Sequence, residues 1–211
     1  MVTLLTDTIG RVSALARGAR KSVKRFGGVI EPMHTLRIAF DDRSGAELVV
    51  LREAKLERAR PFLVTSLERM QAAGQALNWV RKAAPPRTPE PEVWAAMERL
   101  LDHLGNPNDP ISARARLAAT GLQLLAAFGW GVDFERCVSC GKAPAEGQAA
   151  AVDAARGGLV CRDCGGARRR LSGTERVALS RAVTGGELDD DSAALALDLV
   201  EQALKAHGGI E

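Results

Sequence analysis

The sequence predicts an α+β protein made of a small N-terminal β-barrel, an all-α helical domain and an inserted cysteine-rich module. Three observations carry this prediction. Apolar residues alternate with polar ones before residue 55, as in strands, and recur at steps of three and four after residue 56, as in amphipathic helices. All four cysteines stand in one later segment, as two C-x-x-C pairs. A chain of 211 residues, 46% of them hydrophobic, is long enough to bury such cores.

The first 55 residues are predicted to form two strand pairs. VTLLT and RVSALA flank the turn DTIG, and HTLRIAF and ELVVLRE flank DDRSG, a loop rich in residues that tolerate turn geometry. In TLRIAF, Leu36, Ile38 and Phe40 alternate with Arg37 and Ala39, which indicates a strand with one buried face. The segment therefore predicts a small barrel or a fragment of one.

A basic connector, RVSALARGARKSVKRFGGVIEP, joins the two strand pairs. The formal net charge of the whole chain is only +3, but residues 11 to 30 hold no acid and six cations, namely Arg11, Arg17, Arg20, Lys21, Lys24 and Arg25. Such a segment favours contact with phosphates, and the alternative is a solvated surface loop. Only Phe26 and Phe40 could stack on bases in this region, so we expect salt-dependent binding with little sequence preference.

The middle of the chain is predicted to be a helical bundle. RARPFLVTSLERMQAAGQALNWVRKA reads as one helix ended by PPRTPEP, EVWAAMERLLDHL as a second ended by GNPNDP, and ISARARLAATGLQLLAAFGW as a third. The apolar stripe of the first comprises Phe62, Leu63, Leu67, Met70, Ala73, Leu77 and Val80. After the cysteines, LSGTERVALSRAVTG begins with a serine or threonine cap, and DDDSAALALDLVEQALKAH carries acids where the helix dipole favours them.

The cysteines predict a structural zinc site. Cys137-Val-Ser-Cys140 and Cys161-Arg-Asp-Cys164 are separated by twenty residues, a spacing typical of two knuckles that share one tetrahedral ion. Four thiolates close the coordination shell, so no position is left for substrate. The alternatives are an iron–sulfur cluster, a thioredoxin-like redox pair, for which the βαβ context is missing, and incidental cysteines, which would not give two matched pairs.

Neither a membrane segment nor a catalytic site is predicted. The chain has no long apolar run, and MVTLLTDTIG lacks the features of a signal peptide, so we expect a cytoplasmic protein whose thiols stay reduced. His34, His103 and His207 lie in unrelated segments, and neither a nucleophile elbow nor a G-x-x-x-x-G-K-[ST] phosphate loop occurs. The chain is therefore predicted not to be an enzyme.

Three stretches resemble the bacterial RecO family. VTLLTDTIGRVSALARGARKSVKRFGGVIEPMHTLRI is similar to the family's N-terminal OB-fold segment, and LLAAFGWGVDFERCVSCGK and GGLVCRDC are similar to its two zinc knuckles. The resemblance covers nearly the whole chain in order. Family members usually begin with one more strand, so the OB-fold-like barrel here is expected to lack its first strand. The chain also ends at AHGGIE, before the family's usual final segment.

The resemblance implies a non-catalytic recombination mediator of DNA repair. Such proteins bind and anneal single- and double-stranded DNA and help load RecA onto strands covered by single-stranded DNA-binding protein. The partners implied are RecR, the C-terminal tail of single-stranded DNA-binding protein and, in some cases, RecF. The family's basic surface falls on Arg17, Arg20, Lys21, Lys24 and Arg25, and its ligands for one structural zinc ion on Cys137, Cys140, Cys161 and Cys164.

The expected organisation has four parts: an OB-fold-like DNA-binding domain at 1–55, a helical domain at 56–135, a zinc-ribbon-like module at 136–167, and C-terminal helices at 168–211 that pack on the helical domain. Arg168, Arg169 and Arg170 either extend the DNA surface or form the solvated start of the next helix. The alternative function is a zinc-ribbon scaffold that acts mainly through protein–protein contacts.

Overall fold

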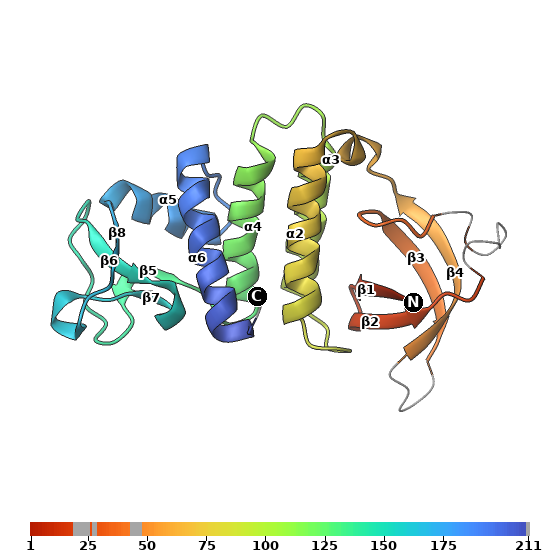
Figure 1. Cartoon of the computed structure of the whole chain (residues 1–211), viewed down its shortest axis with the longest axis horizontal. Coiled ribbons are helices and arrows are strands. Elements are labelled where there is room, and N and C mark those ends of the chain that lie inside the picture. The colour runs from red at the N-terminus through yellow and green to blue at the C-terminus, as the bar shows by residue number, and fades with distance from the viewer. Residues whose placement is uncertain (19–25, 27–28, 43–47, 210–211) are drawn as a thin grey trace.

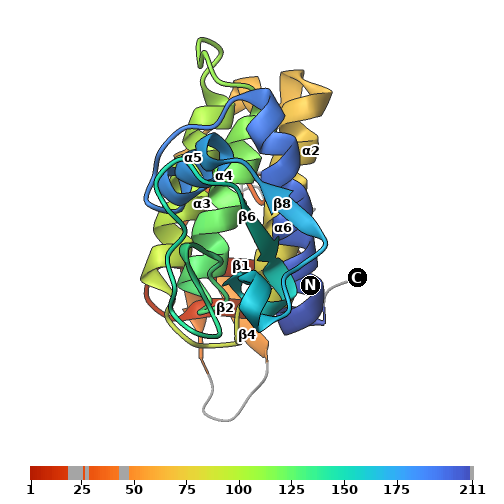
Figure 2. The same cartoon turned by 90° about the vertical axis from the view of Figure 1, so that its left-hand side faces the viewer.

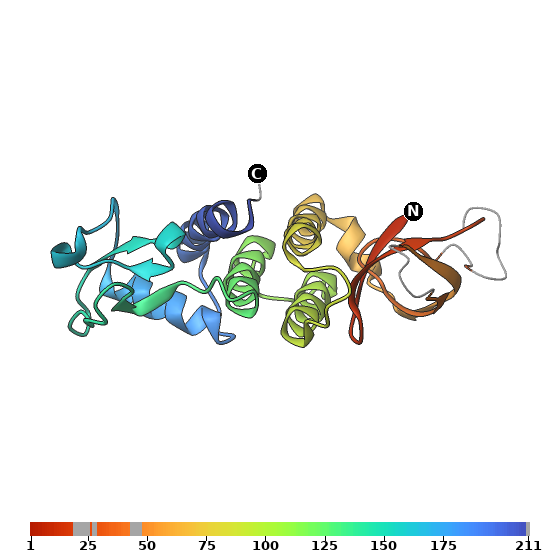
Figure 3. The same ribbon diagram turned by 90° about the horizontal axis from the view of Figure 1, so that it is seen from below.

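The computed structural model describes residues 1–18, 26, 29–42 and 48–209. The chain is a mixed α+β protein, as predicted. It is elongated, with one sheet at the N-terminal end, helices in the middle and a second sheet at the other end (Figure 1). Seen from below, these parts follow one another in a row (Figure 3).

The N-terminal sheet contains four described strands in the order β1-β2-β4-β3. Antiparallel β1/β2 and β3/β4 pairs confirm the two predicted strand pairs, and β2 and β4 join them in parallel. Phe26 and Leu51 lie in the core of this sheet, and Leu36, Ile38 and Phe40 pack against it. The strands are β1 (Val2–Thr6), β2 (Gly10–Leu15), β3 (Thr35–Asp41) and β4 (Leu48–Arg58).

The first predicted helix is divided in two. Pro61–Thr65 forms a 3₁₀ turn, and α2 (Leu67–Ala83) begins only after Ser66, whose hydroxyl accepts the backbone N–H of Arg69. This cap starts the helix one turn later than the apolar stripe suggested. As a result Phe62 and Leu67 are 50% and 66% exposed, whereas Leu63, Ala73 and Val80 of the same stripe are buried.

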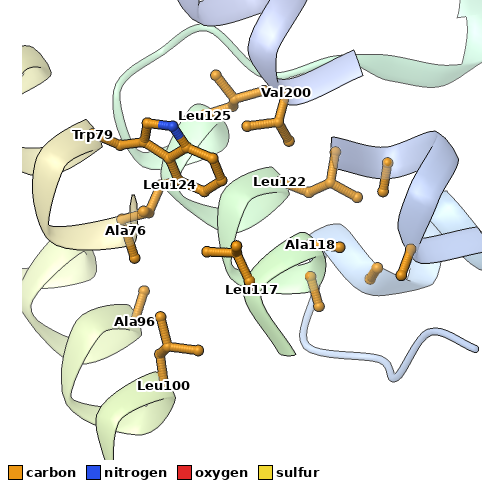
Figure 4. Packing of buried hydrophobic residues seen from close by; sticks show 14 of the residues in the cluster. Ala76, Trp79, Ala96, Leu100, Leu117, Ala118, Leu122, Leu124, Leu125 and Val200 are labelled. Atoms are coloured by element: carbon orange, nitrogen blue, oxygen red, sulfur yellow. The ribbon is translucent and has the colours of Figure 1, made fainter. Parts of the chain in front are cut away.

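Three further helices complete the central layer. They are α3 (Pro91–Gly105), α4 (Ala113–Ala127) and, from the C-terminal part of the chain, α6 (Asp190–Gly208). Side chains of all four long helices meet in one core around α4, including Trp79, Leu100 and Val200 (Figure 4). Gly121 of α4 permits this approach, because a Cβ there would lie 3.0 Å from Val200 and 3.1 Å from Trp79. No helix among the described residues is both long and apolar enough to span a membrane.

The cysteine-rich segment forms a second sheet, with the order β5-β7-β6-β8, beside α5 and α6 (Figure 2). The hydrophobic core of the helices also includes four residues of this module, Phe134, Val152, Leu159 and Leu171. The module is therefore packed against the helical domain. Its strands are β5 (Asp133–Cys137), β6 (Ala150–Asp153), β7 (Gly158–Leu159) and β8 (Arg169–Leu171), and α5 (Gly173–Val183) follows.

The arginine run at 168 to 170 does not begin a helix. Arg169 and Arg170 belong to β8, and α5 starts after Ser172, where Ser172 and Glu175 form a reciprocal capping box. The predicted cap is confirmed, but its position excludes the arginines from the helix. Arg169 forms an ion pair with Asp198 of α6 instead.

Candidate metal centre and nucleic-acid interface

The topology of the second sheet brings the two C-x-x-C knuckles together. β5 and β7 are parallel neighbours, and each is followed by one knuckle. The carboxyl ends of parallel neighbours lie at the same edge of a sheet, so the knuckles meet there. The β6–β7 hairpin, which turns at Gly157 with φ of +84°, supplies the predicted connection into the second knuckle.

The four cysteine sulfurs form one compact cluster. Their Sγ atoms all lie within 4.8 Å of one another, and those of Cys140 and Cys161 are 3.7 Å apart. Ligands of a tetrahedral ion with bonds of about 2.3 Å would be about 3.8 Å apart, which fits this spacing. A redox pair would need only two of these cysteines. The arrangement is therefore compatible with a metal ion held by all four.

Backbone groups favour a thiolate at Cys137. The N–H of Cys161 donates to Cys137 Sγ over 3.4 Å, and this bond, with the N–H groups of Ser139 and Cys140, lowers the pKa of Cys137 to about 6. Hydrogen bonds with the thiols of Cys161 and Cys140 raise the pKa of Cys164 to about 12. Cys137 therefore loses its proton readily, whereas Cys164 loses its proton only when a cation stabilises the thiolate. A bound metal ion supplies that positive charge, so the four cysteines suit a metal site.

Positive-φ glycines shape both knuckles. Gly141 has φ of +75° and donates its N–H to the carbonyl of Cys137, and Gly165 has φ of +98° and donates to the carbonyl of Arg162. Residues with a Cβ rarely adopt this conformation. The two glycines therefore fold each knuckle back on itself.

The predicted phosphate-binding segment is only partly described. Arg17 is exposed directly after β2, whereas Arg20, Lys21, Lys24 and Arg25 lie outside the described residues. Phe26 is 1% exposed in the core of the N-terminal sheet. The basic segment is thus anchored to this sheet at both ends, by β2 and by Phe26.

The three histidines have separate surroundings. His103 Nδ1 lies 2.8 Å from Asp109 Oδ2, which also binds Arg116, and the His207 ring stacks on Trp130 with centroids 6.3 Å apart. His34 precedes β3 and lines a cavity of about 680 Å³ between β1, β3 and the helices α2 and α3. Each histidine therefore belongs to a different part of the fold.

Sequence reasoning missed several arginines near the cysteine cluster. Arg156 Nη2 donates to Ser139 Oγ over 2.9 Å, although seventeen positions separate them, and Arg162 lies inside the second knuckle. Isolated arginines give no charge run, unlike residues 168 to 170. Arg162 stands between two cysteines and Arg156 directly precedes a pair of glycines, and these sequence positions could have identified both residues.

Comparison with known proteins gives consistent matches over both halves of the chain. Residues 1–60 match the family model described as "Recombination protein O N terminal", and residues 64–211 match "Recombination protein O C terminal". A DNA repair protein RecO from Anaeromyxobacter sp. (strain K) is 36% identical over 165 residues, which cover 78% of this chain and 63% of that protein. The RecO of Myxococcus xanthus is 34% identical over 179 residues, which cover 85% of this chain and 70% of that protein. Over the first relatives the match spans about 63% of their length.

Proposed function

The chain belongs to the RecO family of DNA repair proteins, and from that premise we propose that it is a non-catalytic, DNA-binding recombination mediator. It binds single- and double-stranded DNA, anneals complementary strands, and helps load RecA onto single strands covered by single-stranded DNA-binding protein. The observation that carries the proposal is the match of both halves of the chain, in order, to the two parts of this family.

DNA contact through the basic connector is supported by charge and position. Residues 11 to 30 hold six cations and no acid, and both ends of this segment are fixed to the N-terminal sheet, where Phe26 is buried. Arg17, Arg20, Lys21, Lys24 and Arg25 are the proposed DNA-binding residues. Each phosphate that they neutralise releases counterions, so binding weakens as salt is added.

The N-terminal sheet is proposed to be an OB-fold-like barrel, of which the structure describes four strands. Two antiparallel pairs joined by the parallel pairing of β2 and β4 support this, since an OB-fold is a five-stranded Greek-key barrel. The proposed domains are 1–55 for DNA binding, 56–135 for the helical bundle, 136–167 for the metal module and 168–211 for the C-terminal helices.

We propose one structural zinc ion for the cysteine cluster. The supporting observations are the four sulfurs within 4.8 Å of one another and the absence of any other ligand type in the group. Zinc would fix both knuckles and, through the shared core, the docking of the second sheet on α5 and α6. Cys137, Cys140, Cys161 and Cys164 are the proposed ligands.

The proposed protein partners are RecR, the C-terminal tail of single-stranded DNA-binding protein and RecF. The alternative is a scaffold that acts through protein contacts alone. One observation favours it: Phe62, Val64 and Leu67 are each at least 50% exposed and close in sequence, as in a surface that a protein partner covers.

A salt titration of single-strand binding separates the two functions. The purified protein is titrated against a fluorescently labelled oligonucleotide at several NaCl concentrations. A mediator that uses several cations gives a linear fall of log K with log salt, with a slope of about −0.7 for each neutralised phosphate. Failure to bind at low salt would contradict DNA binding and leave the scaffold.

A further inference from the structure

Four exposed arginines lie close to the cysteines in sequence or contact a knuckle. Arg136 directly precedes the first cysteine, Arg162 directly follows the third, and Arg168 lies four residues after the last. Arg156 reaches the first knuckle from the 3₁₀ turn between β6 and β7. We call these four residues the arginine rim.

Hydrogen bonds and sulfur contacts bring Arg156, Arg162 and the loop before Arg168 to the first knuckle, and Arg136 is joined to that knuckle by the chain itself. Arg156 donates to Ser139 Oγ over 2.9 Å, one residue from Cys140. Cys140 Sγ lies 3.7 Å from Cys161 Sγ, which places Arg162 beside the first knuckle. The N–H of Gly166 donates to the carbonyl of Cys161, so the loop that leads to Arg168 folds back on the same cluster.

No rim arginine forms an ion pair with any residue that the structure describes. Two other cations of the module are used internally: Lys142 lies 3.4 Å from Asp163, and Arg169 pairs with Asp198 of α6. The rim guanidinium groups are therefore available to a ligand, with Arg156 also holding the Ser139 hydroxyl.

The other carboxylates of the module lie at its base, toward the helices. Asp133 accepts the backbone N–H of Glu135, and Glu135 itself accepts the hydroxyl of Ser180 on α5. Asp153 caps the turn that packs on α6. Glu146 belongs to a turn that touches the start of α5, where a Cβ on Gly173 would lie within 2.5 Å of Gly147. Asp163 is thus the one carboxylate within a knuckle, and Lys142 pairs with it.

The rim carries more charge than the metal site requires. A zinc ion with four thiolates has a net charge of −2, so four arginines leave an excess of positive charge at the tip of the module. Guanidinium groups bind phosphate oxygens through paired N–H donors. Since the module and the N-terminal sheet lie at opposite ends of the molecule (Figures 1 and 3), this excess is far from the N-terminal sheet.

We infer that the arginine rim is a second phosphate-binding surface. It holds a different nucleic-acid strand from the one bound at the N-terminal sheet. This inference rests on the proposed DNA binding and adds a site and a geometry to it. One protein molecule bridges two strands, with one at each end. Bridging raises the local concentration of one strand near the other, which is what annealing needs.

The test compares the zinc-loaded full chain with two charge-reversed variants. Arg162→Glu with Arg168→Glu alters the rim, and Arg99→Glu with Arg114→Glu makes the same charge change on exposed helical residues that pair with no carboxylate in the described part of the chain. Binding to one labelled oligonucleotide is titrated with salt. Energy transfer between two non-complementary single strands, carrying donor and acceptor dyes, reports bridging without annealing.

The rim variant should lose the transfer signal, whereas its binding of one oligonucleotide at the N-terminal sheet should keep the parent's salt slope. The helical variant should match the parent. Arg162→Gln with Arg168→Gln, checked for bound zinc, adds no acid beside the thiolates and should show the same loss in weaker form. A zinc-loaded rim variant with the parent's transfer signal would overturn the inference alone, whereas a parent that does not bind DNA would overturn the proposed function.

Discussion

At the residue scale, Arg60 joins the N-terminal sheet to the helical domain. Its side chain is 2% exposed and donates to the carbonyl of Met33 and the hydroxyl of Thr35 on the sheet side. On the helix side it donates to Glu98 and Asp102 of α3, at 3.2 and 2.7 Å. The planar fork of arginine can meet four acceptors at once, which lysine cannot do.

Replacing Arg60 should loosen this junction. We expect Arg60→Met to lower the free energy of unfolding by about 2 kcal/mol, because several charge-assisted hydrogen bonds are lost while the partly exposed carboxylates can still be hydrated. Arg58→Met is the matched control: Arg58 also pairs with Asp102, but its side chain is 54% exposed, so the loss should stay below about 1 kcal/mol. Urea unfolding measures both values, and equal losses would contradict a special role of the buried arginine.

At the element scale, periodicity and cysteine spacing predicted most of the fold. The two N-terminal strand pairs, α3, α4 and α6 follow the expected residues, because each has an apolar face and clear end signals. The division of the first helix at Ser66 and the strand β8 at Arg169–Leu171 were not predicted. The division of the helix depends on a single serine cap, and the strand depends on tertiary pairing. Hydrophobic spacing reveals neither of them.

The cysteine cluster was predictable from sequence, and its arginine rim was not. Two matched C-x-x-C pairs identify ligands locally. The rim depends on the parallel pairing of β5 with β7 and on the turn that carries Arg156 to Ser139. Such contacts between distant positions are set by topology. A count of charges along the chain therefore does not identify the rim.

Removal of the metal should loosen the cysteine-rich module and α5 and leave the N-terminal sheet intact. We expect Cys164→Ser, or chelation under reducing conditions, to abolish zinc binding and to speed hydrogen exchange in residues 133–171 and in α5, which share a core. Strands β1 to β4 have a separate core and should exchange as before. Ser139→Ala, within the same knuckle, should keep its zinc. Unchanged exchange in the zinc-free protein would contradict a structural role.

At the scale of the whole molecule, the helices lie between the two sheets (Figure 1). α4 and α6 lie in the middle of one core, with the N-terminal sheet on one side and the cysteine module on the other (Figure 1). Both ends hold exposed arginine, Arg17 at one and Arg162 at the other. Binding and bridging of a polyanion is the function that this distribution supports best.

The most direct test of the central claim is the rate at which the protein anneals two complementary single strands, measured by loss of donor fluorescence. The parent should accelerate annealing without a nucleotide, and the acceleration should fade as salt rises. Arg20→Glu with Lys21→Glu should remove most of it while the unfolding midpoint stays unchanged, and Arg99→Glu with Arg114→Glu should retain it. Annealing at the parent's rate by a folded Arg20→Glu and Lys21→Glu protein would contradict the assignment of DNA binding to the basic connector.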